Sequence, residues 1–66
     1  LARFYLTLGL TDEAGELANK IKKEIRDNKV PDLDDIKGEL GDVLWYLSEL
    51  AFNYNISLEE AAKSNI

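Results

Sequence analysis

The sequence predicts an all-α fold, an antiparallel hairpin of two long helices followed by a short C-terminal helix. Apolar side chains recur every three or four residues along two long segments, which is the period of a helix with a buried face. The one proline, Pro31, lies between these segments in a stretch short enough to make them antiparallel neighbours. Ser57 and Glu60 have the spacing of a helix capping box, which indicates a third helix near the end of the chain.

The first predicted helix runs from about Ala2 to Asp27. Its apolar stripe stays in phase through Gly9, so we expect one continuous helix, with a break at Gly9 as the alternative. At roughly 100° per residue, Glu13 flanks this stripe by about 60°, and Glu16 lies further round toward solvent. Lys20 follows Glu16 by one turn, where a simple i, i+4 ion pair is one interpretation. The stripe consists of Leu6, Leu10, Ala14, Leu17, Ile21 and Ile25.

The second predicted helix runs from about Leu33 to Asn53, with Asp32 as its cap. Its expected core stripe is Leu33, Ile36, Leu40, Val43, Leu47 and Leu50, widened by Leu44 and Ala51. Trp45 and Phe52 lie on the side away from this stripe. Because one hairpin partner cannot cover both faces, we predict a subunit interface at Trp45 and Phe52 in a homodimer or homotetramer. The third helix opens at Ser57, and we expect the chain end to cut it off at Ile66.

The composition restricts the kinds of site that the chain can build. Its 66 residues form a single small domain over 1–66, and the start at Leu1 inside an apolar pattern suggests further residues at both ends. The absence of Cys and His excludes disulfides, Cys/His zinc sites and Ser–His or Cys–His catalysis. A net charge of −5 disfavours a nucleic-acid partner. With no membrane-spanning run and no visible signal peptide, we predict a cytoplasmic protein without a membrane partner.

Two acidic tetrapeptides, residues 13–16 and 39–42, organise the chain. Each places two carboxylates three residues apart, on one helix face. A glycine inside a helix costs about 1 kcal/mol, so we expect a backbone or a ligand to approach Gly15 and Gly41. Both pairs border stripes that face each other in a hairpin, and four carboxylates around one point need a cation. Oxygen ligands suit Mg²⁺, or Mn²⁺, which also binds substrate phosphates. The candidate ligands are Glu13, Glu16, Glu39 and Asp42.

Each of these features also has a simpler interpretation. Either acidic pair alone is typical of a solvated helix face. Trp45 is typical of an aromatic anchor in a core or an interface. Tyr46 shares the acidic flank of its helix, where it could instead stack on a nucleobase. Asn65 alone is only a polar residue at a chain end.

The motifs together resemble the MazG-like nucleotide pyrophosphohydrolases, whose signature is ExxE, a spacer and then ExxD. The resemblance rests on residues 8–16, 39–47 and 56–66 and covers nearly the whole chain from about Leu6. It implies an all-α fold with sites assembled from two or more subunits. It also implies Mg²⁺-dependent hydrolysis of a nucleoside triphosphate to the monophosphate and pyrophosphate, as house-cleaning of non-canonical or excess nucleotides.

The resemblance also implies residue roles. Glu13, Glu16, Glu39 and Asp42 would hold the metal, and Glu16 or Glu13 would orient or deprotonate the attacking water. Asn65 and Tyr46 match nucleotide-contacting positions, and we group Lys20 with them. Relatives often carry a Lys shortly after the Asn65 position, beyond the end of this sequence, so the preferred base is not predicted.

Two alternatives to an enzyme remain open. One is a catalytically silent helical module of the same fold that binds nucleotide or metal, or that serves for dimerisation. The other is a plain acidic hairpin without a ligand. Metal-dependent release of pyrophosphate separates the enzyme from both.

Overall fold

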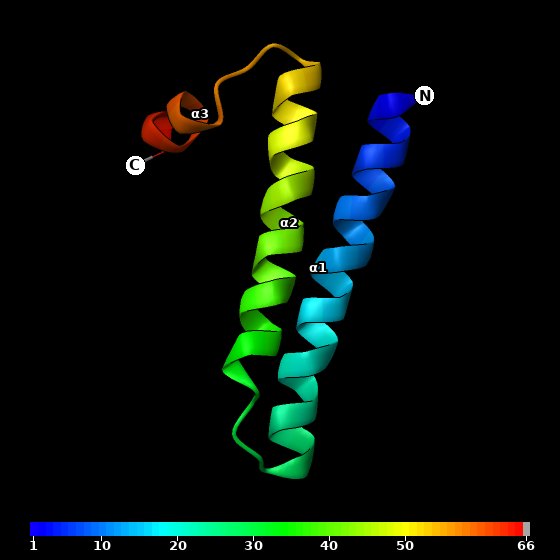
Figure 1. Ribbon diagram of the computed structural model, residues 1–66, viewed down its shortest axis with the longest axis vertical. Coiled ribbons are helices and arrows are strands. Elements are labelled where there is room, and N and C mark those ends of the chain that lie inside the picture. The colour runs from blue at the N-terminus through cyan, green and yellow to red at the C-terminus, as the bar shows by residue number, and fades with distance from the viewer. Residues whose placement is uncertain (66) are drawn as a thin grey trace.

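The computed structural model describes residues 1–65 and contains three α-helices, α1 (Ala2–Asp27), α2 (Leu33–Asn53) and α3 (Leu58–Ser64). The helices α1 and α2 lie antiparallel and side by side, and α3 lies beside the end of α2, away from α1 (Figure 1). The predicted hairpin with a short third helix is confirmed. The helix α1 is continuous through Gly9, so the alternative of a break there is wrong. The helix α3 ends at Ser64, and Ile66 lies outside the described residues.

Local side-chain chemistry explains where the helices begin and end. The Asp32 carboxylate accepts hydrogen bonds from the backbone N–H groups two and three residues later, at 3.0 and 3.4 Å. The Ser57 hydroxyl accepts from the N–H of Glu60 at 3.2 Å. Asn28 and Asn55 have φ angles of 51° and 57°, a left-handed conformation that asparagine tolerates better than most residues. These asparagines turn the chain out of α1 and α2.

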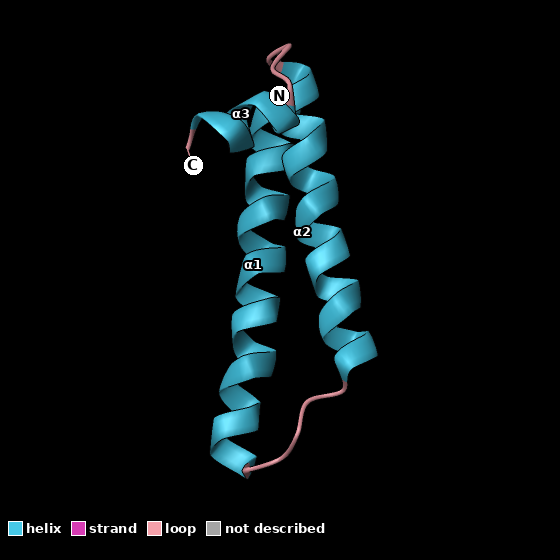
Figure 2. Cartoon of the chain, turned by 90° about the vertical axis from the view of Figure 1, so that its left-hand side faces the viewer, coloured by secondary structure: helices cyan, strands magenta, loops and turns pink. Residues whose placement is uncertain are grey.

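The end of the hairpin opposite its loop is closed by Arg3. Its guanidinium Nε donates to the side-chain oxygen of Asn53 at 2.9 Å, and the group lies 3.9 Å from the centre of the Tyr54 ring. The view turned by 90° also shows α1 and α2 side by side along their length (Figure 2). The two helices therefore form one continuous contact, which fixes the register between the acidic pairs.

The contact face between α1 and α2 is not the purely apolar seam that we expected. Leu6 is the one buried hydrophobic side chain within residues 1–65, and Glu39 of α2 is just as buried, at 8% exposed. Glu13, Lys20 and Tyr46 are half-buried on the same contact face. Because α2 is apolar on two sides, its periodicity did not decide which side meets α1. Several expected core residues are exposed instead: Ala14, Ile21, Ile25, Leu33, Leu40, Leu44 and Leu47.

A glycine is needed where Tyr46 of α2 packs directly on α1. A Cβ added at Gly9 would overlap the Tyr46 ring, whereas a Cβ at Gly15 or Gly41 would meet no atom within 4 Å. The close approach that we expected at Gly15 and Gly41 is therefore absent within the described chain. It occurs at Gly9.

Gly9→Ala is expected to destabilise the protein by about 1–2 kcal/mol, because the displaced Tyr46 ring costs more than the gain in helix propensity. Gly38→Ala is the matched control, since Gly38 also lies in a helix but has open space at its Cβ. It should stabilise the protein by up to about 1 kcal/mol. Urea unfolding of the three proteins measures both effects. Equal shifts for the two substitutions would contradict the packing of Tyr46 on Gly9.

The hairpin leaves unusually much surface in contact with solvent. A compact protein of 7.5 kDa exposes about 4,200 Å², whereas this chain exposes 5477 Å². Its radius of gyration is 14.1 Å, compared with about 11 Å for a compact domain of this length.

Among residues 1–65, none of the helices combines the length and apolar character that a membrane crossing requires.

Candidate metal centre

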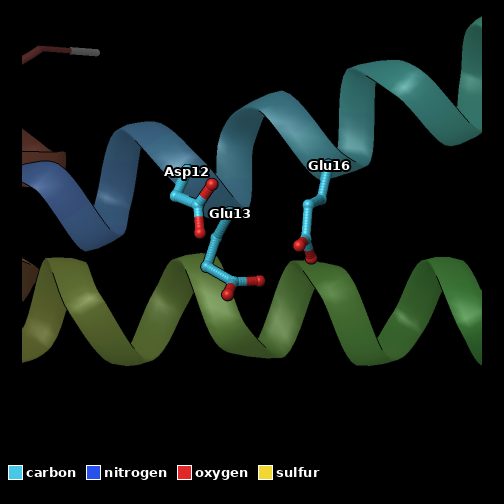
Figure 3. Close-up of side chains that lie close together, drawn as sticks. All are labelled: Asp12, Glu13 and Glu16. Carbon is cyan, nitrogen blue, oxygen red and sulfur yellow. The ribbon is translucent and has the colours of Figure 1, made fainter.

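Carboxylates from both long helices converge at the middle of the hairpin. One oxygen each from Glu13 of α1 and from Glu39 and Asp42 of α2 lie within 4.8 Å of one another. A second group on α1, formed by Asp12, Glu13 and Glu16, meets the same distance limit. The three α1 side chains reach toward α2 (Figure 3). Glu13 belongs to both groups, so the structure joins all four predicted carboxylates into one cluster.

Asp12 is the member of the cluster that the sequence analysis missed. It directly precedes Glu13 and lies four residues before Glu16, which is also a same-face spacing on a helix. That spacing was the available signal, but the ExxE pattern drew attention to the pair three residues apart. The side chain of Asp12 is exposed, so it lies at the rim of the cluster.

The pKa values of the two glutamates at the centre of the cluster shift in opposite directions. Burial raises the pKa of Glu13 from 4.5 to about 7, and the neighbouring Glu39, Glu16 and Asp42 add to this increase. Glu39 has the opposite shift, because the ammonium group of Lys20 holds its pKa below the ordinary value. Within the described chain, Oε2 of Glu13 and Oε2 of Glu39 are both buried without a hydrogen-bond partner.

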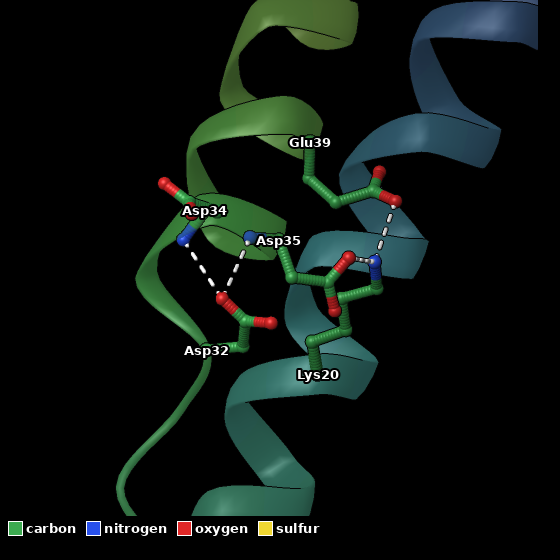
Figure 4. A network of polar contacts seen from close by, with 5 residues as sticks. All are labelled: Lys20, Asp32, Asp34, Asp35 and Glu39. Atoms are coloured by element: carbon green, nitrogen blue, oxygen red, sulfur yellow. Dashed lines mark hydrogen bonds and ion pairs between the residues drawn. The ribbon is translucent and has the colours of Figure 1, made fainter.

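Lys20 connects the cluster to the start of α2 (Figure 4). Its Nζ lies 2.6 Å from Oδ1 of Asp35 and 3.0 Å from Oε1 of Glu39. These two acidic partners raise the pKa of Lys20. The i, i+4 ion pair of Lys20 with Glu16 is absent from residues 1–65, so that interpretation is wrong. The partners of Lys20 lie on the opposite helix, so the register between α1 and α2 determines which carboxylates it meets.

Tyr46 lies next to the cluster. With Tyr5, Leu8, Gly9 and Asp12 it lines a hollow on the surface of the hairpin, and Asp12 is common to this hollow and to the cluster. Burial, followed by neighbouring Tyr5 and acidic groups, raises the pKa of Tyr46. The hollow therefore offers aromatic and apolar surface beside a strongly negative centre.

The sequence is similar to known proteins over nearly its whole length. Residues 4–66 match the family model of the MazG nucleotide pyrophosphohydrolase domain. The chain belongs to this family. It is 42% identical over 66 residues to the Gene 37 protein of Mycobacterium phage L5, a match that covers 94% of this chain and 58% of the phage protein. The MazG domain seen here thus spans less than two thirds of that relative's length. No solved structure matches the chain.

The donor set of this MazG domain fits a divalent cation. The MazG family uses divalent metals, and the cluster offers only carboxylate oxygens, the ligands preferred by Mg²⁺ and Mn²⁺. Two of these oxygens are buried and have no partner, which is costly unless a cation or a proton binds there. A cation held by Glu13, Glu39 and Asp42 would satisfy both.

Asn65 lies away from the cluster in this MazG chain, whereas Trp45 and Phe52 lie on the surface of α2. Asn65 follows α3, which packs against α2 and has no contact with α1 among residues 1–65. The amide nitrogen of Asn65 donates to the backbone oxygen of Ala61 at 2.9 Å. Trp45 and Phe52 are 54% and 70% exposed, so the described chain leaves more than half of each residue uncovered. One chain alone therefore does not bring Asn65 to the carboxylates.

Proposed function

We propose that this MazG domain is a Mg²⁺-dependent nucleoside triphosphate pyrophosphohydrolase. It would convert a ribo- or deoxyribonucleoside triphosphate and water to the monophosphate and pyrophosphate, as house-cleaning of non-canonical or excess nucleotides. The observation that carries the proposal is the carboxylate cluster, which contains two buried oxygens without partners in a domain of this family. Mn²⁺ has the same preference for oxygen and is the alternative cofactor. The cytoplasmic location stays a prediction.

Each carboxylate has a role in this proposal. Glu13, Glu16, Glu39 and Asp42 would hold the metal, which when bound neutralises phosphate charge and acidifies water. Glu16 or Glu13 would orient or deprotonate the attacking water. The cation also explains how a protein of net charge −5 accepts a polyanionic substrate.

Tyr46, Asn65 and Lys20 are the proposed nucleotide contacts. The hollow at Tyr46 supports a place for the base or sugar beside the metal. Lys20 is bound to Asp35 and Glu39, so a phosphate contact would require it to leave one of these carboxylates. Because α3 of the same chain lies away from the cluster, we propose that a second subunit contributes Asn65.

The exposed apolar side of α2 supports a homodimer or a homotetramer. Trp45 and Phe52 are each more than half exposed, and so are Leu40 and Leu44 on the other apolar side of α2. Exposed apolar surface of this kind in a small, extended chain is typical of a subunit interface. A bundle of two hairpins would cover this side of α2 and bring further helices to the cluster.

Trp45→Ala is expected to weaken self-association at least about tenfold, since a buried aromatic anchor contributes 2 kcal/mol or more to an interface. Sedimentation velocity over a range of concentrations measures the change. Lys37→Ala is the control, because Lys37 is an exposed charged residue of the same helix. Unchanged association of the Trp45 variant would contradict an interface at this position.

The decisive experiment measures pyrophosphate release from a panel of canonical and modified nucleoside triphosphates, with Mg²⁺ and with EDTA. Release with Mg²⁺ only, with the monophosphate as the other product, is the expected result, and the ranking of the panel supplies the base preference. Absence of release from every substrate, by a protein shown to be folded and oligomeric, would overturn the proposal and favour the catalytically silent module.

A further inference from the structure

The two carboxylate oxygens of Glu39 have different surroundings. Oε1 lies 3.0 Å from the ammonium of Lys20, whereas Oε2 is buried without a partner. The Glu39 side chain is only 10% exposed. It is also the only member of the cluster with an ion-pair partner in residues 1–65. One oxygen is therefore held by the protein, and the other is left for the cluster.

Lys20 is itself held in place by a second carboxylate. Asp35 lies one helical turn before Glu39 on α2, and its Oδ1 is 2.6 Å from the ammonium of Lys20. The Lys20 side chain is 29% exposed, which is low for a lysine on a two-helix surface. A free lysine side chain has several rotatable bonds, but two acidic partners on the opposite helix restrict this one.

We propose that Lys20 and Asp35 are positioning residues for the metal ligand Glu39: Asp35 holds Lys20, and Lys20 holds Oε1, so that Oε2 faces the cation. The inference rests on the proposed metal site and adds two residues outside the acidic pairs to it. Ligating carboxylates are commonly fixed by such outer partners, whose loss costs about 10- to 100-fold in metal affinity.

Charge alone predicts the opposite result for Lys20, which makes the proposal testable. Removal of a positive charge beside a cation site should tighten cation binding, because the repulsion between ammonium and metal is lost. Removal of a positioning group should weaken binding, because Glu39 is then free to turn to other rotamers. The sign of the change in affinity therefore separates the two roles.

The experiment titrates Mn²⁺ into the full chain at pH 8 and follows the free ion by electron paramagnetic resonance, with circular dichroism as a check on folding. Lys20→Met and Asp35→Asn are expected to bind Mn²⁺ about 10- to 100-fold more weakly than the wild type. Lys20→Arg, which keeps the charge and the hydrogen bonds, should recover part of the loss. The matched controls Lys22→Met and Asp34→Asn change the same charges at exposed positions and should stay within about twofold.

Binding by Lys20→Met as tight as the wild type, or tighter, would overturn the proposal and make Lys20 a competitor of the metal. If Lys20→Met does not fold, the Asp35→Asn variant provides the test, since it leaves Lys20 in place. A Mn²⁺ affinity of Asp35→Asn equal to that of Asp34→Asn would overturn the positioning role. Failure of the wild type itself to bind Mn²⁺ would instead reject the metal site of the proposed function.

Discussion

Glu39→Gln and Asp42→Asn are each expected to lower pyrophosphate release about a hundredfold to a thousandfold at saturating Mg²⁺. Each substitution keeps the shape of the side chain but replaces an anionic oxygen donor by a neutral amide. Glu39 is the most informative position, since it is 8% exposed and its Oε2 has no partner within residues 1–65. Initial rates, measured with circular dichroism to confirm the helix content, provide the test.

Glu49→Gln is the matched control for both substitutions. Glu49 also lies on α2, but it is exposed and outside the cluster. Its rate should therefore remain within about twofold of the wild type. Wild-type rates in both Glu39→Gln and Asp42→Asn would show that the metal site has been assigned to the wrong residues.

The helices could be predicted because their limits depend on local chemistry. Pro31 restricts the residue before it, and the side chains of Asp32 and Ser57 bond to N–H groups two or three residues away. These interactions involve neighbours in the sequence, so a single sequence contains them in full. The bounds of α1 and α2 accordingly agree with the prediction at both ends.

The face on which the helices meet could not be predicted in the same way. The leucines of α2 include Leu40 and Leu47, which periodicity placed in the core, yet both are exposed, while Glu39 is buried between the helices. Periodicity identifies an apolar face of a helix but not the element that packs on it. The helix α2 has two apolar faces, and α1 can cover only one of them. If a second subunit covers the exposed leucines, the predicted stripe describes the assembly rather than the single chain.

The site was predicted in its residue types and only partly in its contacts. Glu13, Glu39 and Asp42 converge as expected, because i, i+3 spacing puts each acidic pair on one helix face and the register of the hairpin brings the two faces together. The pairing of Lys20 with Asp35 instead of Glu16 required the register between α1 and α2. That register depends on the packing of Tyr46 against Gly9, a contact between residues far apart in the sequence.

The metal-free protein is expected to lose thermal stability between pH 5 and pH 8, because Glu13 must ionise in the folded state. The folded state raises the pKa of Glu13 from 4.5 to about 7, so between these values it binds a proton that the unfolded chain does not hold. The stabilisation from this proton is fully present below about pH 4.5 and is lost as the pH rises through about 7. The pKa of Glu39 is lowered from its ordinary value of 4.5, so its effect on stability falls at lower pH, outside this window.

Glu13→Gln isolates this effect, because a glutamine stays neutral at every pH. In EDTA, the melting temperature of the variant should change less between pH 5 and pH 8 than that of the wild type, and at pH 8 it should be the higher of the two. Addition of Mg²⁺ at pH 8 should reverse the order, since the cation binds the ionised wild-type cluster and stabilises the fold by mass action. Parallel melting curves for the two proteins across this range would mean that the proton on Glu13 does not stabilise the fold. A rise in wild-type melting temperature with pH would contradict the raised pKa itself.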